Sequence, residues 1–318
     1  MRILLATDFS AYADTARSLV NSMALPEGTR IRIVHAIEPI SAVAIFASTA
    51  LRTINDATAR DARDLVKTTA SFLTAAGREV DGVVGIGRAA DVVIDECAGF
   101  KPDLLVVGSR GRGGIATTVL GSVSAELVDR SPCPVLVTRT NRLAKVVLAE
   151  DGSASAIAGA RAITDLPPFA TSTVRVVSVV DAPFPIVLAD PGLPQTALDA
   201  FREFEISVQQ LRAAYAACAR ERAEALSGAA ISATWERREG HAATELLAVA
   251  AEQHADCIVI GSRGQTGLRR FMLGSVARSV LFHAPCSVLI AHVSPIDEGS
   301  TTHASEQFDV EPAHTMPA

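Results

Sequence analysis

The sequence Gly108-Ser109-Arg110-Gly111, followed after nine residues by Gly121-Ser122, recurs as Gly261-Ser262-Arg263-Gly264, nine residues and Gly274-Ser275. The two copies begin 153 positions apart, close to half of the 318 residues, and 13 of 30 positions are identical between 108–137 and 261–290 without a gap. This agreement indicates an internal duplication. Each copy follows an apolar run and precedes a segment able to form a helix, which is the order of strand, glycine loop and helix start that a phosphate site requires.

The duplication divides the chain into two units of about 140 to 150 residues, a common size for a domain. We predict a first domain over 1–140 and a second over 143–293, joined by a junction of a few residues. The polar stretch 294–318 has no apolar period and is predicted to form a flexible tail. Because 49 % of the residues are hydrophobic and 20 % are charged, both units have enough apolar material for a buried core.

Charge and apolar patterning exclude several classes of partner and location. The net charge of −6 argues against a nucleic-acid footprint or an anionic membrane surface, both of which favour clustered Lys and Arg. The apolar stretch at the start is cut short by Asp8, and no stretch approaches the roughly 18 apolar residues of a membrane span. The five cysteines show no C-x-x-C spacing and are expected to be buried, reduced thiols. We therefore expect a cytoplasmic protein.

Each unit alternates short apolar runs with helical periodicity, which is typical of a doubly wound α/β domain with a parallel sheet. Strands are expected over 2–6, 31–37, 79–84, 104–107 and 135–138, and again over 145–149, 174–180, 231–235, 258–260 and 288–291. A helix over about 50–76 carries Leu65 and Phe72 on its apolar stripe. The clearest helical period of the second unit marks an apolar face made of Phe201, Phe204, Val208, Leu211, Tyr215 and Cys218.

The repeated glycines suit the approach of an anion to the backbone. A glycine lets N–H groups come close to phosphate oxygens, because a Cβ would block the approach. The nine-residue spacer lets the chain leave the sheet and return with a Gly-Ser pair that opens a helix, whose unpaired N–H groups and dipole favour an anion. We therefore predict two equivalent anion sites, made by Gly108, Gly111, Gly121 and Ser122 in the first unit and by Gly261, Gly264, Gly274 and Ser275 in the second.

One aspartate follows the first strand of each unit, Asp8 in the first and Asp151 in the second. Open parallel sheets bind ligands beyond the carboxyl ends of their strands, so one crevice can hold this aspartate and the glycine loop. A carboxylate suits a phosphate poorly, and we assign both aspartates to the base or ribose of a nucleotide. The P-loop and the dinucleotide fingerprint do not fit, since the loops lack the P-loop lysine and Thr7-Asp8-Phe9-Ser10 follows the first strand.

These residues resemble the universal stress protein family in its tandem two-domain form, over about residues 1–293. The ATP-binding members of that family carry G-x2-G-x9-G-Ser/Thr, which both loops match. The resemblance implies, in each unit, a five-stranded parallel sheet of order 3-2-1-4-5 and one ATP, with Mg²⁺ held mainly by phosphates and water. It places adenine near Asp8 or Asp151, with backbone contacts near Ala36 and Val179. The implied contacts are completed by Arg110, Val123, Arg263 and Val276.

The resemblance points to a regulator that binds ATP. Slow ATP hydrolysis, with Asp8 or Asp151 orienting a water, and a dimerising scaffold without nucleotide are the alternatives. The sequence offers no positioned base beside a nucleophile and no metal-ligand cluster, so catalysis lacks its usual parts. The two units are expected to pack by pseudo-two-fold symmetry through their last strands, and whole chains are expected to self-associate.

Several of these side chains also have a purely structural interpretation. Arg110 and Arg263 are compatible with solvated loop positions as well as with phosphate contacts. Asp8 could cap the following helix, although Ser10 suits that role better. His35 lies within the second strand and has Ser178 as its counterpart. Because the imidazole is not repeated, we interpret His35 as a hydrogen-bonded core residue.

Overall fold

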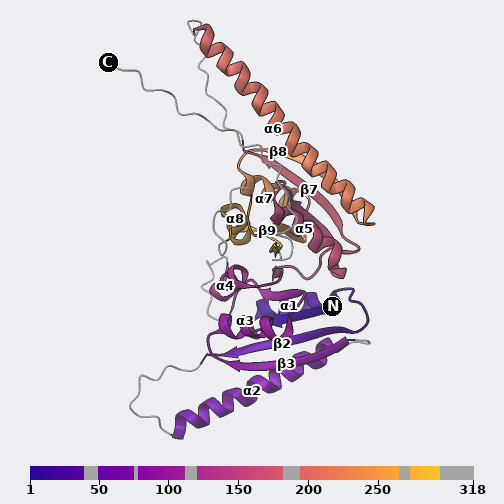
Figure 1. Ribbon diagram of the computed structural model, residues 1–318. Coiled ribbons are helices and arrows are strands. Elements are labelled where there is room, and N and C mark those ends of the chain that lie inside the picture. The colour runs from indigo at the N-terminus through magenta and orange to yellow at the C-terminus, as the bar shows by residue number, and fades with distance from the viewer. Residues whose placement is uncertain (39–48, 75–77, 112–119, 182–193, 265–272, 294–318) are drawn as a thin grey trace, which may run out of the picture.

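The computed structural model describes residues 1–38, 49–74, 78–111, 120–181, 194–264 and 273–293. Ten strands form one sheet of order β3-β2-β1-β4-β5-β10-β9-β6-β7-β8 (Figure 1). Its strands are β1 Arg2–Ala6, β2 Thr29–Ile37, β3 Arg78–Ile86, β4 Leu104–Gly108, β5 Val135–Thr138, β6 Lys145–Ala149, β7 Thr173–Val180, β8 Ser232–Glu239, β9 Cys257–Gly261 and β10 Ser287–Ala291. The α/β class is confirmed, with a mostly parallel sheet covered by helices.

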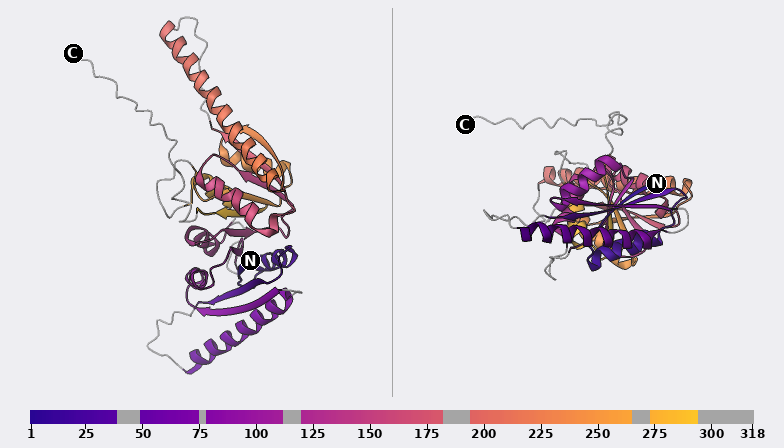
Figure 2. Two further views of the ribbon diagram at one scale, coloured as in Figure 1. Left: turned by 45° about the vertical axis from the view of Figure 1, so that its right-hand side comes forward. Right: turned by 90° about the horizontal axis from the view of Figure 1, so that it is seen from below.

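Helices cover both faces of the sheet (Figure 2). They are α1 Ala11–Ser22, α2 Thr49–Leu73, α3 Ala89–Phe100, α4 Ser122–Arg130, α5 Ala154–Asp165, α6 Gln195–Gly228, α7 Ala242–Glu252 and α8 Ser275–His283, with a short 3-10 turn η1 at Pro167–Phe169. The Ser10 hydroxyl caps α1 by accepting from the Ala13 N–H at 3.3 Å, and Ser153 caps α5 in the same way at 3.1 Å. Equivalent signals therefore begin equivalent helices in the two units.

The two units share a sheet because their last strands pair with each other. Within each unit all pairs are parallel, and the order corresponds to 3-2-1-4-5. At the junction β5 and β10 run antiparallel, with Leu136 opposite Leu289. The expected packing through the last strands is confirmed, and it joins the two five-stranded sheets into one. The pairing satisfies N–H and C=O groups that two isolated edges would leave exposed.

Alternation along the strands sends side chains into two cores that each run through both units. Leu4 and Ala6 of β1 face the core under α3, α4, α7 and α8. Ile3 and Leu5 face the opposite core, under α1, α2, α5 and α6. Because Leu127 of α4 and Val280 of α8 belong to one cluster, the junction is packed as an interior rather than as a wet contact.

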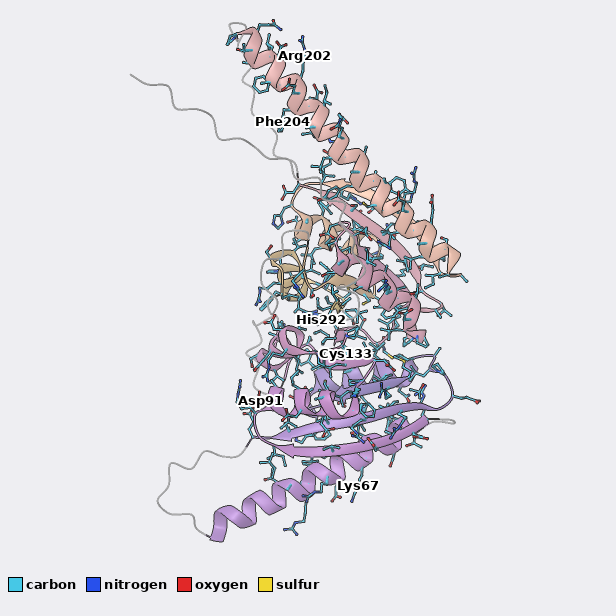
Figure 3. The ribbon with its side chains drawn as sticks, viewed as in Figure 1. Lys67, Asp91, Cys133, Arg202, Phe204 and His292 are labelled. Atoms are coloured by element: carbon cyan, nitrogen blue, oxygen red, sulfur yellow. The ribbon has the colours of Figure 1, made fainter. Side chains whose placement is uncertain are left out.

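The expected apolar faces of the two longest helices are wrong in part. Phe204 and Leu211 of α6 are 37 % and 41 % exposed, and Leu65 and Phe72 of α2 are 44 % and 49 % exposed. The buried residues of α6 lie instead near its C-terminal end, at Ala219, Ala223 and Leu226. Figures 1 and 3 show the reason, since the N-terminal half of α6, where Arg202 and Phe204 are labelled, extends beyond the edge of the sheet.

Other expectations have mixed outcomes. Four of the five cysteines are buried, all five are free thiols, and Cys218 is half-buried. Strand β8 continues to Glu239, beyond the expected end at Trp235. The predicted tail 294–318 lies outside the described residues. Among the helices that the structure describes, none is long and apolar enough to cross a membrane.

Candidate functional site

Two cavities lie at the carboxyl ends of the strands, one in each unit. Their volumes are about 590 Å³ in the first unit and about 520 Å³ in the second. Because β1 pairs with β4, and β6 with β9, the aspartate and the glycine loop of each unit reach the same cavity. The first cavity is lined by Asp8, Ala36, Gly108, Arg110, Gly111, Gly121, Ser122 and Val123. The second is lined by Asp151, Val179, Gly261, Arg263, Gly264, Gly274, Ser275 and Val276.

The first glycine of each loop is required by the fold itself. A Cβ on Gly108 would lie 2.8 Å from the backbone carbonyl carbon of Tyr12, and one on Gly261 would lie 2.5 Å from that of Ser155. Helices α1 and α5 therefore approach the ends of β4 and β9 more closely than any side chain permits. Close helix packing is therefore sufficient to explain these two glycines, and a ligand is not needed to account for them.

The second glycine of each loop makes room for the aspartate. A Cβ on Gly111 would lie 2.8 Å from Asp8 Oδ2, and one on Gly264 would lie 2.9 Å from Asp151 Oδ2. The other carboxylate oxygen accepts a backbone N–H two residues on, from Ser10 at 3.0 Å and from Ser153 at 2.9 Å. Each aspartate thus joins the strand end, the helix start and the glycine loop in one turn.

The third glycine of each loop is less crowded than the first two. A Cβ on Gly121 would lie 3.3 Å from its nearest neighbour, and one on Gly274 would meet 3.5 Å. Both backbones are extended, with φ of −73° and −61°, which any residue can adopt. Neither residue places a side chain over the helix start, although Ser or Asp would cap it better. The missing side chains at Gly121 and Gly274 therefore leave the starts of α4 and α8 open.

These helix starts present N–H groups to the cavities. The first intrahelical bonds run from Ala125 to Gly121 O at 3.0 Å and from Arg278 to Gly274 O at 2.8 Å. The N–H groups of the preceding three residues precede that ladder and point out of the helix end. The N–H of Gly121 itself donates to Ser109 O at 2.8 Å, and that of Gly274 donates to Ser262 O at 2.8 Å. The loop glycine is thereby fixed while the first turn stays oriented toward the cavity.

The arginine of the first loop rests on an aromatic ring. Arg110 Nη1 donates to Tyr12 Oη at 3.0 Å, and its guanidinium carbon lies 5.3 Å from the ring centroid. The second unit has Ser155 in place of Tyr12, so Arg263 lacks this support. Both arginines line their cavities, and the first is the more firmly positioned.

The structural interpretation of His35 fits its surroundings. Its Nδ1 lies 2.8 Å from Thr7 O, and its ring packs against Phe9 with centroids 4.7 Å apart. Ser178 Oγ donates to the matching carbonyl, Glu150 O, at 2.8 Å. Two different side chains therefore bond the same backbone position at the end of the first strand.

An ion pair between Glu150 and Arg222, not predicted from the sequence, lies beside the second cavity. Glu150, where the first unit has Thr7, has a fully buried side chain that accepts from Arg222 Nε at 2.6 Å and from the Gly152 N–H at 2.7 Å. Arg222 belongs to α6, 72 positions away, and no local pattern marks it. Burial, together with the nearby Asp151 carboxylate, raises the pKa of Tyr215 on the same helix.

Phe282 also lines the first cavity, although it belongs to α8 of the second unit and was not predicted from the sequence. Among the described residues, no group of three or more His, Cys, Asp or Glu side chains could hold a metal ion.

Comparison with known proteins supports the duplicated organisation. The family model described as universal stress protein family matches the chain twice, over 1–139 and 143–292. A universal stress protein of Thermus aquaticus is 35 % identical over 140 residues, which are 43 % of this chain and 97 % of that protein.

A solved structure that spans nearly the whole chain has the same fold. A universal stress protein from Archaeoglobus fulgidus matches with a TM-score of 0.64 and 19 % identity, covering 92 % of this chain and 98 % of that one. A family protein of Arabidopsis thaliana, solved with AMP bound, is 22 % identical, with a TM-score of 0.29 over 44 % of this chain and 92 % of its own.

Proposed function

The chain belongs to the universal stress protein family, and we propose that it binds one ATP in each of its two cavities and acts as a nucleotide-dependent regulator. The observation that carries the proposal is the open start of α4 and of α8. Gly121 and Gly274 have no capping side chain although their extended backbones do not require glycine; a Cβ would be a tight fit at Gly121, 3.3 Å from Arg110 Cα, and an ordinary contact at Gly274. A phosphate that accepts from the exposed N–H groups would satisfy both helix starts and interact favourably with their dipoles.

The remaining lining residues suit the other parts of a nucleotide. Val34, Val93 and Val107 give the first cavity apolar walls, and Val177 and Leu246 do so in the second. Asp8 and Asp151 lie at the carboxyl ends of the first strands, where their carboxylates can accept hydrogen bonds from a base N–H or a ribose O–H. The choice of adenine and of a triphosphate follows the family motif that both loops match. Mg²⁺ would be held by the phosphates and water, since it needs few protein ligands when a phosphate supplies oxygens.

Titration calorimetry with Mg·ATP tests the proposal on five proteins. Wild type is expected to bind two nucleotides per chain, and Gly121→Asp and Gly274→Asp one each, because a carboxylate at the helix start opposes a phosphate. The double variant is expected to bind none. Gly99→Asp is the matched control, because a Cβ at Gly99 of α3 meets nothing within 4 Å. Unchanged stoichiometry in the double variant would exclude both helix starts as phosphate sites.

A second experiment distinguishes ATP binding from ATP hydrolysis. In a single-turnover assay, a regulator leaves ATP intact over the time of a binding experiment. Hydrolysis that Asp8→Ala abolishes while binding persists would favour the enzyme instead.

We further propose, from the family likeness, that whole chains self-associate and that they work in the cytoplasm. Sedimentation of the purified protein and fractionation of cells test these two points separately.

A further inference from the structure

Helix α8 begins at the second cavity and ends at the first, whereas α4 begins at the first cavity and its end contacts a residue that lines the second. Helix α4 starts with Ser122 in the first cavity, and its penultimate residue, Asp129, accepts from the backbone N–H of Leu273 at 3.3 Å. Leu273 lines the second cavity and directly precedes Gly274. Asp129 also pairs with Arg278 on α8, at 3.6 Å. The end of the helix that opens the first site therefore holds the loop that opens the second.

Helix α8 makes the reverse connection. It starts with Ser275 in the second cavity, and Phe282 near its end lines the first. Phe282 and Asp129 occupy equivalent positions, 153 residues apart. At equivalent positions, the second unit therefore has an aromatic side chain that lines the first cavity, and the first unit has a carboxylate that binds the N–H of a residue lining the second cavity. Figure 1 shows α4 and α8 on the same side of the sheet, on either side of the junction.

Helices α4 and α8 are close-packed between these two contacts. Leu127 and Val128 of α4 and Val280 and Leu281 of α8 are at most 1 % exposed and belong to one core. Arg139 of the first unit donates to Leu281 O at 2.6 Å and so fixes the end of α8. A close-packed interior transmits displacement rather than absorbing it.

We propose that the two cavities are energetically coupled through Asp129 and Phe282, so that a nucleotide in either cavity strengthens binding in the other. The inference rests on the proposed function. A ligand at the start of α8 fixes the helix whose Phe282 forms a wall of the first cavity. A ligand at the start of α4 fixes the helix whose Asp129 holds Leu273. The first nucleotide thereby positions, through a close-packed helix, a residue that the second site also uses, and by linkage the effect is equal in both directions.

Calorimetry measures the coupling without assuming equal sites. The product of the two stepwise dissociation constants of wild type is compared with the product of the single-site constants of Gly121→Asp and Gly274→Asp. Independent sites give equal products. We expect the wild-type product to be smaller by about fivefold or more, the lower range of allosteric coupling.

The same comparison in two further backgrounds assigns the route. Asp129→Ala with Phe282→Leu removes the acceptor of the Leu273 N–H and the aromatic wall, and is expected to make the two products equal while two nucleotides still bind. Glu126→Gln is the control on α4, because Glu126 pairs with Arg88 and Arg130 of its own unit, and it is expected to leave the ratio unchanged. Equal products in wild type, with two nucleotides bound, would overturn the coupling alone. A ratio that survives Asp129→Ala with Phe282→Leu would overturn the route. Absence of any binding would overturn the proposed function, and the coupling with it.

Discussion

The two cavities share their loop geometry and differ in what supports it. The glycines of both loops meet nearly the same obstacles, and both aspartates bond the N–H two residues on. Behind them, the first unit uses Thr7, Tyr12 and Ser124, where the second has Glu150, Ser155 and Ala277. Ser124 Oγ donates to Gly108 O at 2.8 Å, a bond that Ala277 cannot make. Duplication therefore kept the backbone that faces the cavity and exchanged the side chains that hold it.

The largest expected difference comes from the buried carboxylate. Glu150→Ala removes the partner of Arg222 and an acceptor of the Gly152 N–H, whereas Thr7→Ala at the equivalent position removes a hydroxyl that accepts from the Phe9 N–H at 3.1 Å. Glu150→Ala leaves the Arg222 guanidinium, whose side chain is 23 % exposed, without its partner, so we expect the free energy of unfolding to fall by about 3 kcal/mol, the lower end for a buried pair. Thr7→Ala is expected to cost about 1 kcal/mol. Urea denaturation followed by far-UV circular dichroism compares the two.

The outcome also tests why the pair is present. Replacing both partners, as Glu150→Leu with Arg222→Leu, removes both desolvation costs together and is expected to recover most of the lost stability. If the double variant is no more stable than Glu150→Ala, the stability lost in Glu150→Ala does not come from the unpaired charge of Arg222 alone.

A second difference lies at the junction, where Arg139 and His292 are equivalent residues. Arg139 bonds the end of α8, whereas His292 Nε2 is buried with no hydrogen-bond partner among the described residues. Burial, with a smaller contribution from Arg263, lowers the pKa of His292 to about 4. Folding therefore favours the neutral imidazole, and the unfolded chain, with a pKa near 6.5, binds the extra proton.

The pH dependence follows from that sign. The stability due to neutral His292 is complete above about pH 6.5 and is lost progressively as the pH falls toward 4, by about 3 kcal/mol in all. Because carboxylates titrate in the same range, the measurement is the difference in unfolding free energy between wild type and His292→Asn at pH 7.5 and at pH 4.5. We expect the variant to lose less stability on acidification. An equal loss in both proteins would show that His292 is not held neutral.

The sequence predicted what repeats along the chain and missed what crosses between segments. The helix at 122–130 and the strand at 135–138 follow from local pattern, and the structure has both at those bounds. The pair of Glu150 with Arg222 and the placement of Phe282 in the first cavity depend on segments brought together by the sheet. The end of β8 was misplaced because Glu236-Arg237-Arg238-Glu239 at the sheet edge lacks an apolar alternation. Exposed apolar residues on α6 misled the core assignment, since periodicity does not show how far a helix projects.

The smallest expected difference concerns the arginine of each loop. Tyr12 holds Arg110 by a hydrogen bond and by its ring, and Ser155 offers Arg263 neither. An exposed cation–π contact is worth about 0.5–1 kcal/mol, so Tyr12→Ser is expected to weaken ATP binding at the first site by about two- to fivefold. Tyr12→Phe keeps the ring and separates stacking from the hydrogen bond. Both variants are measured in the Gly274→Asp background, where binding reports on the first site. The expected change in affinity arises only from freeing the Arg110 side chain. Tyr12→Ser in the Gly121→Asp background, where binding reports on the second site, should therefore leave the affinity unaltered. A loss of affinity there would mean that Tyr12 acts on the fold instead of on Arg110.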